Sequence, residues 1–391
     1  MRKTKTPKVN PSQIYTYNFP TNIRFGPGAT NELSPYLKDQ NLINPLIVTD
    51  PQVRQLDFFK KIIGSLASQK ISAHVFSEIN KNPIKSNVLA GRDAFNKMKC
   101  DSIIGIGGGA SMDVARAVAL SIHNKRDLFD YDDLEGGAQY VTEPIPHFIT
   151  IPTTSGTGSE VGRAAVISED DSKRKRILFH PKLMAKIVFA DPELTYELPP
   201  PITAATGMDA LTHNMEAYLA KGYHPMCDGI ALEGTRLIFR SIDTAVNHPD
   251  PKSRSNMMLA SLMGAVAFQK GLGIVHALSH PLSTLLDMHH GLANAINLPH
   301  GLRFNIPGQE PRFQNMAHGM GLPNLDGQSV AQAITELNQR IGLPLNLKEV
   351  GVTRDIVPAL SDLAVNDFCL PANPRDASID DIKELYYQAV G

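Results

Sequence analysis

Two pairs of side chains that can bind a metal ion stand in the second half of the chain, each with a spacing of four residues. The first pair is Asp209 and His213, and the second is His276 and His280. Residues four apart on a helix point from the same face, so each pair can contribute to one cation site. A carboxylate combined with imidazoles favours a divalent first-row ion such as Fe²⁺ or Zn²⁺.

Two further imidazoles, His289 and His290, follow shortly after the second pair. A single histidine on a helix is more often a hydrogen-bonded core residue than a metal ligand. Two separate pairs at this spacing, each in an otherwise apolar helical pattern, indicate a metal site instead. An ion held there would polarise the oxygen of a small substrate.

A glycine-rich segment, GIGGG at residues 105–109, stands between an apolar strand pattern and a helical pattern. Glycines let backbone N–H groups approach a pyrophosphate, and the positive end of the following helix stabilises the anion. The segment is not the GxGxxG fingerprint, so a plain strand-to-helix turn remains an alternative to a phosphate site.

Two more features are compatible with a bound dinucleotide. The loop IPTTSGTGSE at residues 151–160 offers hydroxyl and N–H donors, although an ordinary loop has a similar composition. Asp50 ends the apolar run at residues 45–50, where an acid can accept hydrogen bonds from ribose hydroxyls and repel a 2′-phosphate. Asp50 therefore favours NAD over NADP, with a helix cap as its alternative role.

The first half of the chain has the pattern of a scaffold that brings such loops together. Short apolar runs alternate with amphipathic stretches, which predicts parallel strands connected by helices and hence an α/β fold. The expected strands are residues 45–50, 71–76, 102–109 and 147–154, and the expected helices between them include residues 58–69 and 84–99.

The pattern changes after the segment ELPPPIT at residues 197–203, because long helical patterns with few β-branched runs follow it. Examples that end at glycine are residues 204–222, 255–273 and 329–342. We expect an α/β dinucleotide-binding domain over residues 1–194 and a helical, metal-binding and catalytic domain over residues 195–391.

Composition excludes several classes of protein. The 391 residues are 42% hydrophobic and 20% charged with a net charge of −1, so a nucleic-acid partner is not expected. The three cysteines form no CxxC pair, which favours a reducing compartment. The basic N-terminus leads into no apolar segment, and no stretch approaches the roughly 18 apolar residues of a membrane span. We expect a cytoplasmic protein without a membrane partner.

Four motifs together resemble the iron-dependent (group III) alcohol dehydrogenase family, and the likeness extends from about Phe19 to the C-terminus. They are GGGASMDVARA, IPTTSGTGSE, GMDALTHNMEAY and VHALSHPLSTLLDMHHGLANAINLPH. The resemblance implies a Rossmann-like domain and a helical domain in a dehydroquinate synthase-like architecture. It also implies hydride transfer between NAD and a primary alcohol or its aldehyde, with a divalent metal, at a cleft between the domains.

The resemblance also implies roles for particular residues. His280 matches a position beside the metal that relays a proton or orients substrate, and His289 receives no role. The metal, Fe²⁺ or another divalent ion such as Zn²⁺, is expected on Asp209, His213, His276 and His290. The expected nucleotide contacts are Asp50, Gly107, Gly108, Gly109, Asp113, Thr153, Thr154, Thr157 and Lys175.

The chain departs from the family pattern at two positions in the glycine turn. Ala110 replaces a serine and Arg116 replaces a lysine, so we expect weaker pyrophosphate binding. Glycerol dehydrogenases and dehydroquinate synthases share the fold with fewer protein ligands to zinc, and the four-ligand pattern argues against them.

Arg163 follows the hydroxyl-rich loop and is expected to project into the substrate pocket, where it can hold a carboxylate. The segments around it resemble the branch of the family that acts on 4-hydroxybutyrate. A salt bridge on the surface or between domains is the alternative role.

Other functions and the assembly stay open at this stage. The alternatives are a dehydroquinate synthase-type or glycerol dehydrogenase-type enzyme, and a nucleotide- or metal-binding protein without turnover. The family resemblance implies a homodimer or a higher homo-oligomer, with the segment at residues 15–26 completing a neighbour's sheet.

Overall fold

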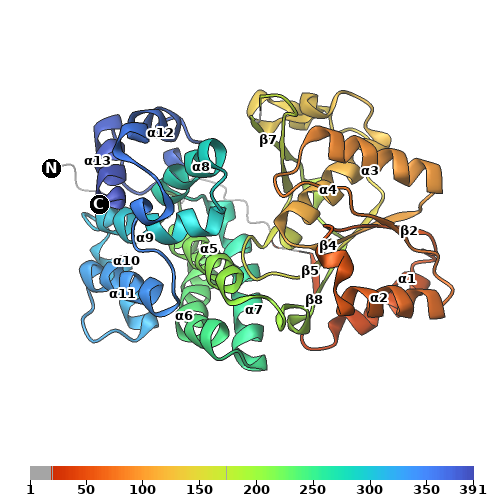
Figure 1. Ribbon diagram of the computed structural model, residues 1–391, viewed down its shortest axis with the longest axis horizontal. Coiled ribbons are helices and arrows are strands. Elements are labelled where there is room, and N and C mark those ends of the chain that lie inside the picture. The colour runs from red at the N-terminus through yellow and green to blue at the C-terminus, as the bar shows by residue number, and fades with distance from the viewer. Residues whose placement is uncertain (1–18, 20, 173) are drawn as a thin grey trace. The chain divides into compact units, whose positions relative to one another are not determined.

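The computed structural model describes residues 19, 21–172 and 174–391, which form two compact units (Figure 1). The α/β unit comprises Pro20–Thr154 and Gly158–Glu197. The helical unit contains Leu198–Gly391 and also the short loop segment Ser155–Thr157. The division thus falls inside the ELPPPIT segment, and part of the hydroxyl-rich loop belongs to the helical unit.

The α/β unit is built on a six-stranded sheet in which every pairing is parallel. The strand order is β1-β8-β5-β4-β2-β3. The strands are β1 (Asn22–Phe25), β2 (Pro45–Val48), β3 (His74–Phe76), β4 (Ser102–Gly107), β5 (His147–Pro152) and β8 (Ile187–Ala190). All four strands expected from the apolar runs form, and the α/β prediction is confirmed.

Both faces of this sheet are covered by helices (Figure 1). Ile103 of β4 packs with Val88 and Val118 on one face, whereas Ile104 packs with Phe59 on the other. The alternation follows from the two-residue period of a strand, and burial on both sides explains why the strands appear as continuous apolar runs. The helices are α1 (Leu33–Asp39), α2 (Asp57–Ser68), α3 (Lys85–Met98) and α4 (Gly109–His123).

A separate antiparallel hairpin, β6 (Ala164–Ser168) and β7 (Lys175–Phe179), also belongs to this unit. The apolar-run pattern did not predict it, nor did it predict β1 and β8. These strands have only four or five residues each, and three of the four residues of β1 are exposed.

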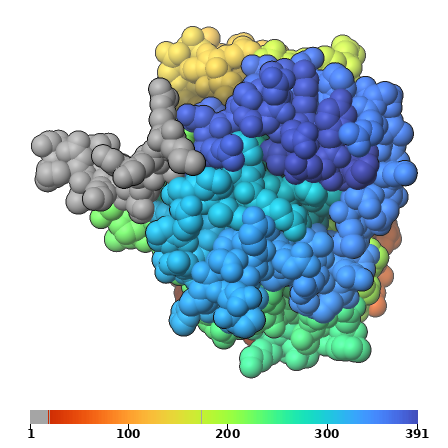
Figure 2. Space-filling view, turned by 90° about the vertical axis from the view of Figure 1, so that its left-hand side faces the viewer, coloured from red at the N-terminus to blue at the C-terminus, as the bar shows by residue number. Residues whose placement is uncertain are grey.

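The helical unit is organised around α5, whose side chains are almost all buried from Thr203 to Leu219. Helix α5 packs against α6, α7 and α9, and α8 packs against α9 and α12. The helices are α5 (Pro200–Leu219), α6 (Pro225–Asn247), α7 (Pro251–Ala267), α8 (Ile274–Leu286), α9 (His290–Asn305), α10 (Glu310–Met320), α11 (Gly327–Arg340), α12 (Val357–Ala364) and α13 (Ile379–Val390). The C-terminal part of the chain, coloured cyan to blue, covers most of the face of this unit in Figure 2.

The prolines of ELPPPIT begin a helix as well as ending the preceding structure. Pro200 and Pro201 occupy the first turn of α5, where a missing N–H leaves no hydrogen bond unmade. Among the described residues, no single helix is long and apolar enough to span a membrane; α7 with its following turn and α8 meet the criterion only as a pair bent by 106°.

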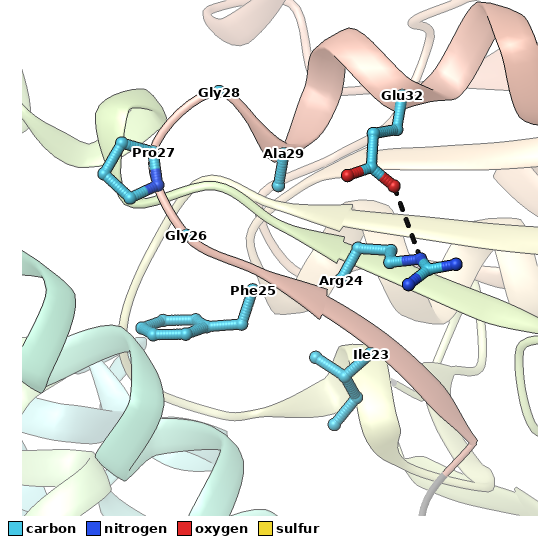
Figure 3. Close-up of a pocket in the computed structure, with 8 residues that line it drawn as sticks. All are labelled: Ile23, Arg24, Phe25, Gly26, Pro27, Gly28, Ala29 and Glu32. Carbon is cyan, nitrogen blue, oxygen red and sulfur yellow. Dashed lines mark ion pairs between the residues drawn. The ribbon is translucent and has the colours of Figure 1, made fainter.

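The N-terminal edge of the sheet borders an open pocket of about 330 Å³ (Figure 3). It is lined by residues 23–29 and Glu32, and an exposed ion pair joins Arg24 Nε to Glu32 Oε2 at 3.3 Å. Of the segment expected to complete a neighbour's sheet, residues 15–18 and 20 lie outside the described residues. Asn22–Phe25 forms the edge strand of this chain's own sheet.

Candidate active site

Three of the four expected metal ligands converge on one point in the helical unit. Ligand atoms of Asp209, His276 and His290 all lie within 4.8 Å of one another. The amide nitrogen of Asn294 lies 2.8 Å from Asp209 Oδ1, 3.3 Å from His276 Nε2 and 3.2 Å from His290 Nε2. An amide nitrogen carries only two hydrogens. Three acceptor atoms directed at one small region therefore fit a cation.

The fourth expected ligand, His213, lies against the other three. Its Nε2 is 3.7 Å from Asp209 Oδ1, and its ring stacks on that of His276 with centroids 4.8 Å apart. Its Nδ1 is buried and has no hydrogen-bond partner in the described part of the chain. A buried imidazole without a full set of partners is costly, which also fits a site built for an ion.

Small residues allow the helices that carry these ligands to approach each other. A Cβ atom on Gly291 would lie 2.2 Å from the carbonyl oxygen of Ala205 on α5. Only glycine therefore lets α9 begin, at His290, directly against α5. This contact explains the glycine that follows the histidine in the motif HHGLAN.

The charges of the site suit metal binding. Burial by itself raises the pKa of Asp209, but three neighbouring imidazoles and the Asn294 amide outweigh it and hold the pKa below its ordinary value. Burial, the largest cause, lowers the pKa of His276 and of His290 well below the ordinary value for histidine. An ionised carboxylate and neutral imidazoles are the forms that coordinate a cation.

Two buried carboxylates behind the histidines were missed in the sequence. Glu216 Oε2 lies 2.6 Å from His276 Nδ1, and Asp367 Oδ2 lies 2.7 Å from His280 Nδ1. Burial raises the pKa of Glu216 to about 7, against the opposing effect of the N–H groups at the start of α8. Glu216 stands in the same motif as Asp209, so helical spacing was a usable signal for it. No sequence signal connects Asp367 to His280.

His280 lies beside the four expected ligands, and its ring is partly exposed. It is stacked between the rings of His290 and Phe368, with centroids 5.3 and 5.1 Å away. Its Nδ1 faces a carboxylate, so Nε2 is the nitrogen left for a substrate or water. This position suits a proton-transfer group.

In the α/β unit, the glycine turn joins β4 to α4. Gly107 has a φ of 147°, and a Cβ atom there would lie 2.4 Å from Ser111 Oγ and 3.3 Å from Asp50 Oδ2. Asp50 Oδ1 accepts the N–H groups of Gln52 and Val53 at 2.9 and 2.8 Å. Asp50 therefore caps the turn after β2, and its second oxygen faces the glycine turn.

Other expected nucleotide contacts gather at the same ends of the strands. The N–H of Thr153 donates to the Gly107 carbonyl at 3.0 Å, and a Cβ atom on Gly108 would lie 3.4 Å from Thr154 Oγ1. Gly109 is the first residue of α4. Thr157 belongs instead to the helical unit, where Ser261 of α7 donates to the adjacent Gly156 carbonyl.

Asp113 and Arg116 tie this turn to the following loop. Asp113 accepts hydrogen bonds from Ser159 Oγ at 2.9 Å and Val166 N at 3.2 Å. Arg116 is completely buried and donates to the carbonyl of Ala164. The lysine-to-arginine departure thus lies in an internal tie, which corrects our expectation that it weakens pyrophosphate binding directly. A nucleotide contact by Asp113 stays a prediction.

Two basic residues complete the set of expected contacts. Lys175 begins β7 opposite Ser168 and is close enough to help lower the pKa of Asp113, which burial raises to about 6. The guanidinium of Arg163 lies 5.4 Å from the ring centroid of Phe179. No carboxylate among the described residues forms an ion pair with Arg163, so the salt-bridge alternative finds no support.

Comparisons with known proteins identify the family. Two family models match: "Iron-containing alcohol dehydrogenase" over residues 20–192 and "Fe-containing alcohol dehydrogenase family, C-terminal" over residues 203–390. The chain is 38% identical to 4-hydroxybutyrate dehydrogenase of Cupriavidus necator, covering 95% of this chain and 98% of that protein. It is 34% identical to 1,3-propanediol dehydrogenase of Citrobacter freundii, covering 96% and 99%.

Solved structures give the same result. A structure of 1,3-propanediol oxidoreductase has a TM-score of 0.92 at 33% identity and covers 96% of this chain and 100% of its own. Sulfoacetaldehyde reductase from Bifidobacterium kashiwanohense in complex with NAD⁺ has a TM-score of 0.88 at 29% identity, covering 97% and 100%. The resemblance seen in the four motifs is confirmed, and the chain belongs to the iron-containing alcohol dehydrogenase family.

Proposed function

We propose that this dehydrogenase interconverts a primary alcohol and its aldehyde by hydride transfer between the substrate and NAD(H). Its metal, Fe²⁺ or another divalent ion such as Zn²⁺, would be held by Asp209, His213, His276 and His290. The observation that carries the proposal is the convergence of a carboxylate oxygen and two Nε2 atoms within hydrogen-bond range of the Asn294 amide.

The side chains around this point have distinct tasks in the reaction. A bound divalent ion lowers the pKa of an alcohol and polarises an aldehyde carbonyl. Asp209 supplies negative charge, and Glu216 and Asp367 hold the rings of His276 and His280. His280 transfers the hydroxyl proton between substrate and solvent through Nε2, directly or through water.

The nucleotide is assigned to the glycine turn of the α/β unit. Backbone N–H groups of residues 107–109 and the N-terminus of α4 suit a pyrophosphate. Asp50, whose second oxygen faces this turn, favours NAD because it would repel a 2′-phosphate. The remaining contacts are assigned to Asp113, Thr153, Thr154, Thr157 and Lys175.

The substrate we propose is a short hydroxy acid such as 4-hydroxybutyrate, with Arg163 binding its carboxylate. The name of the 38% identical relative supports this class of substrate. Arg163 is half-buried, packs on Phe179 and has no carboxylate partner among the described residues. An arginine in this state is available to bind an acid bidentately.

The test is a substrate panel with protein purified anaerobically and analysed for metal. NADH formation at 340 nm is followed with 4-hydroxybutyrate, 1,3-propanediol and butanol. We expect NADH to accumulate, fastest with the acid. A metal-loaded protein that forms no NADH with any primary alcohol contradicts the proposal, and it would favour the lyase alternative, which uses NAD only transiently.

We further propose a cytoplasmic homodimer or higher homo-oligomer without nucleic-acid partners. The three cysteines Cys100, Cys227 and Cys369 are buried and unpaired, as suits a reducing compartment. Size-exclusion chromatography with light scattering tests the assembly, and a monomeric mass contradicts it.

A further inference from the structure

Glu216 connects the central helix of the helical unit to the first turn of α8. Its side chain is 2% exposed. Oε1 accepts the N–H of Val275 at 2.7 Å, and Oε2 accepts the N–H of His276 at 3.2 Å. Oε2 also lies 2.6 Å from His276 Nδ1. One buried carboxylate thus contacts both the backbone and the ring of an expected metal ligand.

These contacts decide which ring nitrogen of His276 carries the proton. Both oxygens of Glu216 face backbone N–H groups, so both act as acceptors. Nδ1 must then be the donor to Oε2, and Nε2 keeps its lone pair. That lone pair faces the point shared with Asp209 and His290.

The surrounding packing leaves room for this arrangement. A Cβ atom on Gly273 would lie 2.9 Å from Glu216 Oε1 and 2.6 Å from Asn373 Oδ1. Asn373 Oδ1 accepts the next N–H in the same turn, that of Ile274, at 3.1 Å. Two buried side chains therefore hold the start of α8, but only Glu216 also reaches the imidazole of His276.

We propose that Glu216 is a positioning residue that fixes the tautomer and orientation of His276 and thereby sets the affinity of the metal site. The inference rests on the metal site of the proposed function. An acceptor behind a ligand imidazole orients the ring and makes its other nitrogen a better ligand. Glu216 performs this task while it caps the helix that carries the ligand.

The substitution Glu216→Gln separates the two tasks. An amide has one acceptor oxygen and one NH₂ group. With its oxygen on the Val275 N–H, it turns the NH₂ toward His276 Nδ1. The ring must then accept there and carry its proton on Nε2, where it blocks coordination. We expect Co²⁺ to bind about 10- to 100-fold more weakly to the metal-stripped variant than to wild type.

Asn373→Ala is the matched control, because it removes an acceptor from the same helix start and leaves the ring contact intact. We expect a lower melting temperature with Co²⁺ affinity near that of wild type. Equal weakening in both variants, or none in Glu216→Gln, overturns the proposal. Wild-type protein that binds no divalent ion contradicts the metal site itself, and so the proposed function.

Nitrogen-15 NMR of the histidines in metal-free wild-type protein provides a test that needs no stable variant. The His276 signals are assigned with His276→Gln. We expect the proton on Nδ1. A proton on Nε2 overturns the proposal, whatever the variants do.

Discussion

Nδ1 of His280 lies 2.7 Å from Oδ2 of Asp367, although 87 residues separate them in the chain. The other oxygen of Asp367 accepts the N–H of Cys369 at 2.9 Å. The carboxylate is therefore held in place and holds the ring in turn. His280 consequently presents Nε2 away from Asp367, which is the orientation that its proposed role in proton transfer requires.

Asp367→Asn is expected to lower kcat about 10- to 100-fold without loss of metal, because an amide no longer enforces the Nδ1–H tautomer of His280. Steady-state kinetics and metal analysis measure the two effects. Asp362→Asn, an exposed change on α12, serves as the control. Wild-type kcat in Asp367→Asn would contradict the assignment.

His276→Ala is expected to lose metal and activity together, because the change removes one of four ligands and leaves Glu216 without its imidazole partner. Metal per chain is measured by elemental analysis alongside turnover. His248→Ala, at an exposed histidine beyond α6, should retain both. A His276→Ala protein with full metal content and normal turnover would refute the ligand role.

Arg163→Ala is expected to reduce kcat/KM for 4-hydroxybutyrate about 10- to 100-fold, because a charged hydrogen bond contributes about 1.5–3 kcal/mol. Butanol has no carboxylate and is the internal control, so its kcat/KM should change little. An unchanged preference for the acid in the variant would remove Arg163 from the substrate pocket.

Asp50→Asn tests the choice of nucleotide and spares the turn, because the amide oxygen can still accept the N–H groups of Gln52 and Val53. Removing the charge should raise the ratio of kcat/KM for NADP⁺ to that for NAD⁺ about fivefold, as expected for about 1 kcal/mol of repulsion near the surface. A constant ratio would mean that Asp50 only caps the turn.

Glu160→Gln tests a pH dependence of stability in the α/β unit. Burial raises the pKa of Glu160 from 4.5 to about 7. The folded protein binds this proton more tightly than the unfolded chain does, so the stability it contributes is complete below about pH 4.5 and is lost as the pH rises to about 7.

A neutral glutamine should therefore stabilise the protein more at pH 8 than at pH 5, by a difference of about 2 kcal/mol. Urea unfolding of wild type and variant at both pH values measures it. The same difference in stability at pH 5 and pH 8 would show that Glu160 stays ionised in the folded protein.

The main strands and helices could be predicted because their patterns are local. The run that forms β4 is apolar on both faces, and the spacing of Asp209 and His213 already places them on one helix face. The short strands β1 and β8 could not be found in this way. β1 gains its place by pairing with β8, more than 160 residues later, as Asn22 opposite Ile187.

The types of ligand, their spacing within each helix and the glycine turn were determined by the sequence alone, since each depends on neighbours a few residues away. Tertiary structure alone decided that α5, α8 and α9 bring the ligands to one point, that Asp367 supports His280, and that Arg116 is an internal tie. These contacts join segments far apart in the chain, and packing between helices creates them. No local periodicity records which buried acceptor will face which imidazole.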